Sequence, residues 1–380
     1  MDIVTILKAA VKHDASDIFI TAGRPVTLKV SGRMATLSQD ALSDEDARDL
    51  VLGTMSDEQK KIFERDKECN YALETKGAGR FRVSALFQRN RVAMVLRRIK
   101  DEIPTIEELH VPEIIKELSM TKRGLVIFVG ATGSGKSTTL AAMIGYRNHN
   151  STGHILSIED PIEFNHQHAG CVVTQREVGI DTESYDIALK NSLRQAPDVI
   201  MIGEIRSRDT MDYGIAFAET GHLCLSTLHA NNANQAMDRV INFFPEERHK
   251  QLFLDLSLNL KAVVAQRLIP RKNGNGRTVA VEVLINTPLV GDMIEKGRVG
   301  EIKDVMKRSR ELGMQTFDQA VYDLYKAGEI SYEEALRNAD SANEVRLMIK
   351  LGMESGELAK DSAVSSLSLQ AEPEDVIGRM

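Results

Sequence analysis

The 380-residue sequence contains no tryptophan, and aromatic residues make up only 5% of it. Proteins that bind single-stranded nucleic acid stack the bases on aromatic side chains within a basic groove. The net charge of −7 also gives the chain no general attraction for a phosphate backbone. A nucleic-acid translocase is therefore disfavoured, and we expect no nucleic acid among the partners.

Only three cysteines are present, Cys69, Cys171 and Cys224, and they lie far apart in the sequence. None belongs to a C-x-x-C pair, which argues against a zinc site. An odd number of widely spaced cysteines suits reduced thiols in a cytoplasmic protein. We expect all three to be small buried apolar side chains.

The sequence also lacks an apolar run of about 18 residues, the length that a membrane-spanning helix requires. Its first 17 residues carry charges in and beside a short apolar stretch. They predict an amphipathic helix and not a secretion signal. We therefore expect a cytoplasmic protein with no direct membrane insertion, able to dock on a membrane complex.

Residues 1–100 predict a small α+β domain. A helical pattern comes first, and strand patterns such as those at 16–20, 26–30, 80–86 and 92–97 predict an antiparallel sheet. Residues 43–46 have the capping and acidic side chains that begin a helix. The charged, proline-containing stretch 101–112 is the predicted linker, and a short helix is expected near 106–118.

Residues 113–353 predict a second domain of the α/β class. The stretches 125–129, 154–158, 199–202 and 223–227 are typical of strands buried on both faces of a largely parallel sheet. Helical patterns lie between them. From about residue 259 onward the pattern predicts mainly helices. The Ser-rich, acidic stretch 354–380 predicts a poorly ordered tail.

The run GATGSGKS at 130–137 matches the pattern G-x-x-x-x-G-K-[ST] and stands between a predicted buried strand and a predicted helix. The glycines let backbone amides point at phosphate oxygens. A lysine here reaches the terminal phosphates, and the following serine offers its hydroxyl to Mg²⁺. The predicted ATP-binding residues are Gly130, Ala131, Thr132, Gly133, Ser134, Gly135, Lys136, Ser137 and Thr138, with Ser137 also on the metal.

Two acidic clusters follow two of the predicted buried strands, where open α/β sheets bind their ligands. They are EDPIE at 159–163 and GEIR at 203–206. We interpret Glu163 as the base that polarises the attacking water and Glu204 as the acid that holds Mg²⁺ through water. A solvated loop carboxylate is the alternative for either acid alone, but two clusters in one domain favour a hydrolytic site.

His222 and His229 bracket the strand predicted at 223–227, so their imidazoles face opposite ways and should not chelate one metal together. One can reach phosphate while the other reaches a neighbouring element. Arg80 and Arg82 share one face of a predicted strand, and Arg97 lies on a nearby strand. These arginines are either solvated surface groups or, if the first domain packs on the nucleotide of another subunit, trans-acting arginine fingers.

The segments GATGSGKSTT, SIEDPIEF, RQAPDVIMIGEIR and ETGHLCLSTLHANNA, in this order, resemble the hexameric secretion ATPases of type IV pili and type II secretion. SIEDPIEF is similar to the aspartate box of that family and GHLCLSTLH to its histidine box. In its short N-terminus and its lack of a tetracysteine motif, the sequence resembles the retraction branch of this family, the PilT/PilU family. Within it, residues 306–343 and the tail resemble the PilU-like members.

The resemblance implies a RecA-like P-loop ATPase domain preceded by a smaller α+β PAS-like domain. It implies a homohexameric motor that drives or assists type IV pilus retraction and twitching motility. It also implies a PilT-like ATPase and an inner-membrane pilus platform protein as partners, with the chain at the cytoplasmic face of the pilus base. An ATP-binding coupling or adaptor subunit and a pilus-extension or secretion ATPase are the alternatives. The implied catalytic residues are Lys136, Glu163, Glu204, His222, His229, Arg80, Arg82 and Arg97.

Overall fold

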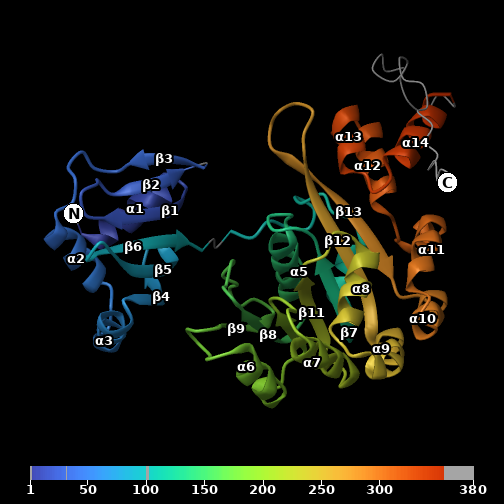
Figure 1. Ribbon diagram of the computed structural model, residues 1–380, viewed down its shortest axis with the longest axis horizontal. Helices are drawn as coiled ribbons and strands as arrows, with labels where there is room; N and C mark the ends of the chain where they lie inside the picture. The colour runs from blue at the N-terminus through green and yellow to red at the C-terminus, as the bar shows by residue number, and fades with distance from the viewer. Residues whose placement is uncertain (1, 31, 100–101, 355–380) are drawn as a thin grey trace, which may run out of the picture. The chain divides into compact units, whose positions relative to one another are not determined.

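The computed structural model describes residues 2–30, 32–99 and 102–354. These residues form a six-stranded sheet near the N-terminus and a seven-stranded sheet in the rest of the chain (Figure 1). The expected order, an antiparallel sheet followed by a sheet with parallel strands, is confirmed. Of the predicted tail, residues 355–380 lie outside the described residues.

The six-stranded sheet has the strand order β3-β2-β1-β6-β5-β4, and its neighbouring strands are antiparallel. Its apolar side chains pack with those of three helices in a core that contains the fully buried Phe63, Phe81 and Leu96. The elements are α1 (Ile3–Lys12), β1 (Ala15–Thr21), β2 (Thr27–Val30), β3 (Arg33–Thr36), α2 (Asp44–Leu52), α3 (Asp57–Asp66), β4 (Glu68–Thr75), β5 (Gly79–Gln88) and β6 (Arg91–Arg98).

Helix α2 begins where the sequence pattern predicts. Oγ of Ser43 accepts a hydrogen bond from the backbone N of Asp46 at 3.0 Å. The Asp46 carboxylate accepts one from the backbone N of Ser43 at 3.2 Å. This reciprocal pair satisfies two backbone donors that the first turn leaves open.

The seven-stranded sheet has the order β13-β12-β7-β11-β10-β8-β9. The pairs among β8, β9, β10 and β11 are parallel, whereas β12 and β13 are antiparallel. Every residue of β7, β10 and β11 is buried, as their continuous apolar sequences predict. The strands are β7 (Gly124–Val129), β8 (Gly153–Glu159), β9 (Cys171–Glu177), β10 (Val199–Ile202), β11 (Leu223–Leu228), β12 (Leu260–Pro270) and β13 (Arg277–Ile285).

Helices lie between most of these strands in the chain, and further helices follow β13 to the end of the described residues (Figure 1). Within the described residues, no helix has the length and apolar character needed to cross a membrane. The helices are α4 (Ile114–Met120), α5 (Lys136–Asn150), α6 (Tyr185–Ser192), α7 (Arg208–Glu219), α8 (Ala233–Asn242), α9 (Glu246–Asn259), α10 (Pro288–Glu295), α11 (Ile302–Arg308), α12 (Phe317–Lys326), α13 (Tyr332–Asn338) and α14 (Ala342–Glu354), with 3₁₀ turns at Leu193–Gln195, Val299–Glu301 and Arg310–Leu312.

Two secondary-structure predictions need correction. The region after residue 259 is mainly helical as predicted, but it begins with two strands that were not predicted, β12 and β13. Most residues of both strands are buried, and the buried polar residues Gln266 and Glu282 break their apolar stretches, so neither stretch has the continuous apolar run of β7 and β10. The short helix expected near 106–118 occupies only Ile114–Met120. Pro112 disfavours helical backbone at the preceding residue, which explains the later start.

Contacts between Cα atoms divide the chain into two compact units. The first comprises Met1–Leu109, Ile115–Ile127 and Ser137–Leu228, and the second comprises His110–Ile114, Phe128–Lys136 and His229–Met380. This division does not fall at the predicted linker. The boundaries 1–100, 101–112 and 113–353 therefore remain predictions.

Candidate nucleotide-hydrolysing site

The loop after β7 holds its backbone in conformations that favour glycine. Gly130, Gly133 and Gly135 have φ angles of +152°, +76° and +95°. A Cβ atom on Gly130 would lie 2.4 Å from Oγ of Ser134 and 2.6 Å from the carbonyl oxygen of Gln266. The loop is thus wrapped tightly and approaches β12 closely, the arrangement that turns backbone amides toward a bound phosphate.

Lys136 places a positive charge inside this loop. Its Nζ donates hydrogen bonds to the carbonyl oxygens of Gly130 at 2.8 Å and Ala131 at 3.0 Å. Oγ of Ser134 is buried and has no hydrogen-bond partner among the described residues. A buried hydroxyl of this kind beside an ammonium group and glycine backbone fits a phosphate, whose oxygens accept hydrogen bonds.

The other predicted nucleotide-binding residues line the same loop and the start of α5. Lys136 and Ser137 are the first two residues of this helix, so its N-terminus adds partial positive charge. The exposed members are Ala131, Thr132 and Gly133, and the half-buried ones are Gly135, Ser137 and Thr138.

The two acidic clusters come together at the carboxyl ends of neighbouring parallel strands. Ile158 of β8 pairs with Ile202 of β10, so both clusters leave the sheet at the same edge. Arg206 joins them, because its Nε donates to Oε2 of Glu204 at 2.7 Å and its Nη1 donates to Oδ2 of Asp160 at 3.4 Å. The sequence pattern included Arg206 in the second cluster but gave it no role.

The acids of the first cluster differ in exposure. Glu163 is exposed, and its role as the base that polarises the attacking water remains a prediction. Glu159 is buried and accepts hydrogen bonds from Oγ of Ser157 at 2.6 Å and Nε2 of Gln175 at 3.1 Å. Burial raises the pKa of Glu159 to about 7, and the nearby charge of Glu163 adds to this effect.

Tyr185, at the start of α6, is a neighbour of these acids that the sequence analysis did not find. Its hydroxyl lies 2.9 Å from the position that a Cβ atom on Gly203 would take. Burial raises the pKa of Tyr185, and the carboxylates of Asp160, Glu159 and Glu204 raise it further. The only sequence signal is the glycine before Glu204, because glycine permits this close approach.

His222 does not lie with these acids. It precedes β11, and its Nδ1 is 3.2 Å from the carbonyl oxygen of Phe217. Val199, the first residue of β10, pairs with Leu223, the first of β11. His222 is therefore at the amino end of the parallel strands, whereas Glu204 follows their carboxyl ends.

His229 follows the other end of β11. It lines a cavity of about 420 Å³ together with Gly130 and Ala131 of the phosphate-binding loop. Asn231 and Gln235 line the same cavity. Of the two predicted histidines, only His229 is placed beside the loop that would hold the nucleotide.

The three predicted arginines share one face of the six-stranded sheet. Arg82 and Arg97 are opposite each other on β5 and β6, and Arg80 is two residues from Arg82. Nε of Arg97 donates to Oδ1 of Asp17 on β1 at 2.9 Å. Arg97 is thus held within its own sheet.

Arg80 and Arg82 approach acids at the end of β9. Nε of Arg82 lies 3.8 Å from Oε1 of Glu177, and Nη2 of Arg80 lies 4.0 Å from Oδ2 of Asp181. Glu177 is opposite Glu159 in the register of β8 and β9. Both arginines therefore lie near the acidic strand ends of their own chain.

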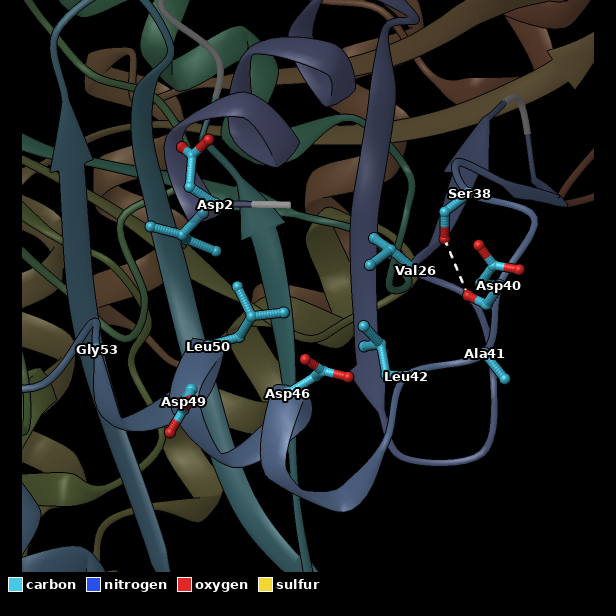
Figure 2. Close-up of a pocket in the computed structure, with 11 residues that line it drawn as sticks. Asp2, Val26, Ser38, Asp40, Ala41, Leu42, Asp46, Asp49, Leu50 and Gly53 are labelled. Atoms are coloured by element: carbon cyan, nitrogen blue, oxygen red, sulfur yellow. Dashed lines mark hydrogen bonds between the residues drawn. The ribbon is translucent and has the colours of Figure 1, made fainter.

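A cavity of about 540 Å³ beside α1 and α2 contains no predicted site residue (Figure 2). Four aspartates line it, but Asp2 caps α1 by accepting from the backbone N of Thr5, and Asp46 closes the capping pair of α2. We therefore assign Asp2 and Asp46 to helix capping.

In the part of the chain that the structure describes, no group of three or more His, Cys, Asp or Glu is placed to hold a metal ion.

A phosphate-binding loop between a buried strand and a helix, with carboxylates at the ends of neighbouring parallel strands, defines a P-loop nucleoside triphosphatase. The family described as type II/IV secretion system protein matches residues 1–339. The chain therefore belongs to this family of ATPases, as its sequence motifs predicted.

Two relatives and one solved structure agree with this assignment. The chain is 62% identical over 379 residues to the type IV pilus ATPase PilU of Pseudomonas aeruginosa, covering 100% of this chain and 99% of that protein. It is 40% identical over 339 residues to the retraction ATPase PilT of the same organism, covering 89% and 98%. A crystal structure of the pilus retraction motor PilT with bound ADP matches with a TM-score of 0.84 and 37% identity, covering 90% of this chain and 98% of that one.

Proposed function

We propose that this chain is an ATP-hydrolysing motor subunit that drives or assists type IV pilus retraction, and thereby twitching motility, as an accessory to a PilT-like ATPase. The observation that carries the proposal is the phosphate-binding loop ending in Lys136, combined with the Glu204–Arg206–Asp160 cluster. Both occur in a chain that is similar over nearly its whole length to two pilus ATPases.

The residues of the loop suit ATP as the nucleotide. Lys136 and the loop amides would bind the phosphates, and the hydroxyl of Ser134 supplies a further polar group. The hydroxyl of Ser137 and, through water, the carboxylate of Glu204 would hold Mg²⁺, which neutralises phosphate charge when bound. Glu163 would orient the water that attacks the γ-phosphorus.

Arg80 and Arg82 would supply further positive charge. Arg97, which bonds to Asp17 on β1, would stabilise the sheet beside them. Charge delivered near the γ-phosphate stabilises the transition state of phosphoryl transfer. We propose delivery to the nucleotide of a neighbouring subunit, because Glu177 and Asp181, with which both arginines pair, lie at and just after the end of the edge strand β9, four strands from β7 in the same sheet. His229 would contact the nucleotide side of the loop, and His222 would support β11 from its other end.

The proposed assembly is a homohexamer at the cytoplasmic face of the inner membrane. Its partners would be a PilT-like ATPase and the pilus platform protein. The similarity to a protein described as a pilus retraction motor supports this assembly. The predicted PAS-like character of residues 1–100 and the RecA-like character of residues 113–353 belong to the same proposal.

An ATP-binding adaptor whose own hydrolysis matters little is the second candidate. Its distinguishing test is pilus retraction in three strains: wild type, Lys136→Ala and a full deletion. The motor proposal predicts that the Lys136→Ala strain retracts as poorly as the deletion, with exposed Lys190→Ala as the matched control. Normal retraction with Lys136→Ala would favour the adaptor.

A pilus-extension or secretion ATPase is the third candidate, and it makes the opposite prediction for the cell surface. Loss of a retraction motor leaves more pili exposed, whereas loss of an extension motor removes them. Counting surface pili in the deletion strain therefore separates the two.

A further inference from the structure

Strand β12 runs directly against the phosphate-binding loop. The carbonyl oxygen of Gln266 lies 2.6 Å from the position of a Cβ on Gly130, and the Leu268 side chain lies 3.9 Å from that of a Cβ on Gly135. This Gln266 carbonyl, which lies next to Gly130, belongs to the peptide bond between Gln266 and Arg267. A shift of Arg267 would therefore move the backbone beside the loop.

The guanidinium of Arg267 connects three other parts of the second unit. Its Nη1 donates to the carbonyl oxygen of Asn338 at 2.7 Å, at the end of α13. Its Nη2 donates to the carbonyl oxygen of Asn231 at 3.2 Å and to Oδ1 of Asp340 at 2.6 Å. The guanidinium carbon also lies 3.9 Å from the ring centroid of Phe317 in α12.

The loop at 229–232 is fixed at the same point. Nδ2 of Asn232 donates to Oδ2 of Asp340 at 3.1 Å. Asn231 lines two cavities, one of about 420 Å³ with Gly130 and His229, and one of about 550 Å³ with Arg267 and Asp340. The loop thus has the phosphate-binding residues on one side and, on the other, Arg267 with its partners Asn338 and Asp340, which we call the Arg267 cluster.

The cluster is itself anchored to the C-terminal helices. Nζ of Lys303 donates to Oδ2 of Asp340 at 2.8 Å, and the backbone N of Asp340 donates to Oδ1 of the buried Asp318 at 2.8 Å. The buried carboxylate of Glu282 accepts from the backbone N of Ala233 at 2.7 Å and of Phe317 at 3.2 Å. It therefore caps α8 and α12 together, so these helices cannot shift independently without losing a buried hydrogen bond.

We infer that Arg267 is a positioning residue of the nucleotide site, coupling the phosphate-binding loop and the loop at 229–232 to the C-terminal helices α12, α13 and α14. A planar guanidinium can serve Asn338, Asn231 and Asp340 at once, whereas a lysine offers one mobile charge. A change at the C-terminal helices would then alter the site through β12, and nucleotide binding would alter the helices in return. The inference rests on the proposed function for its kinetic consequence.

The test compares the full-length variants Arg267→Lys and Arg271→Lys. Arg271 is the matched control, because it pairs with Glu329 from just beyond β12 and its side chain is 24% exposed, against 23% for Arg267. We expect Arg267→Lys to lower kcat/KM for ATP about ten- to a hundredfold, since small misplacements at an active site have effects of this size. Arg271→Lys should stay within about twofold of wild type, as a partly exposed ion pair contributes little. Asp340→Asn should repeat the loss if Arg267→Lys fails to fold.

A second measurement separates coupling from a general structural role. ADP with Mg²⁺ should slow amide hydrogen exchange at residues 338–345 in the wild type and in Arg271→Lys but not in Arg267→Lys. Equal ATP turnover in Arg267→Lys and wild type, or no effect of ADP on these amides in the wild type, would overturn the inference. If the wild type binds ADP but hydrolyses no ATP, the proposed function fails, while the exchange experiment still decides the role of Arg267.

Discussion

Arg206 Nε donates a hydrogen bond to Glu204 Oε2 at 2.7 Å, and the same guanidinium reaches Asp160 at 3.4 Å. One arginine therefore links the acid clusters that follow β8 and β10. Its positive charge offsets the repulsion between carboxylates gathered at one sheet edge. It also sets the direction in which Glu204 presents its oxygens, which matters for any metal held through water.

This link predicts a defect in metal use. Replacing Arg206 with alanine should lower kcat about tenfold and raise the Mg²⁺ concentration needed for half-maximal turnover, because an orienting contact to a metal site typically has effects of this size. Arg208→Ala, which removes a nearby exposed arginine paired with Asp212, is the control. A Mg²⁺ titration of ATP turnover measures both, and identical curves for the two variants would contradict the role of Arg206.

The phosphate-binding loop predicts different costs for two glycine substitutions. Gly130→Ala places a Cβ within 2.4 Å of Ser134 at φ +152°, whereas the same change at Gly133 meets no atom within 4 Å. We expect Gly130→Ala to abolish detectable nucleotide binding and to destabilise the fold by about 1–3 kcal/mol beyond Gly133→Ala. Calorimetric titration with ADP and thermal unfolding measure the two effects. Equal affinity in both variants would argue against close packing as the reason for Gly130.

Buried Glu159 predicts a specific pH dependence of stability. Its pKa is raised from 4.5 to about 7 in the folded chain, so the folded state binds the proton more tightly than the unfolded state. Its contribution to stability is present below about pH 4.5 and is lost as the pH rises through about 7, a change on the order of 3 kcal/mol. As the pH rises over this range, the wild type should therefore lose stability relative to Glu159→Gln. Parallel pH profiles for the two proteins would refute this.

The ion pairs of Arg80 and Arg82 predict how subunits share their residues. If Arg82 serves the nucleotide of its own chain, mixing Lys136→Ala and Arg82→Ala subunits produces no complete site. If it serves a neighbour, about a quarter of the sites in an equal mixture of a cyclic assembly regain both groups. We expect ATP turnover to recover toward that fraction in the mixture, because Arg80 and Arg82 lie beside the edge strand β9, four strands from β7. No recovery would show delivery within one chain.

The parts of the site that the sequence predicted are those encoded in short continuous segments. The loop ending at Lys136 and the acids near Glu163 and Glu204 each follow an apolar strand directly, so strand position and chemistry can be read together. Tyr185 and Arg267 carry no such pattern, because their contacts come from elements distant in the sequence. Strands β12 and β13 were not predicted because the buried polar residues Gln266 and Glu282 interrupt their apolar stretches, unlike the continuous apolar runs of β7 and β10.

ATP turnover by two purified full-length variants, Lys136→Ala and Glu163→Gln, decides whether this site hydrolyses ATP. We predict that Lys136→Ala loses both nucleotide binding and turnover. Glu163→Gln should keep binding but lose about 10²–10⁴-fold in kcat, as expected for removal of a general base. Exposed Glu246→Gln serves as the control for charge. Unchanged turnover in Lys136→Ala would contradict the assignment of the site.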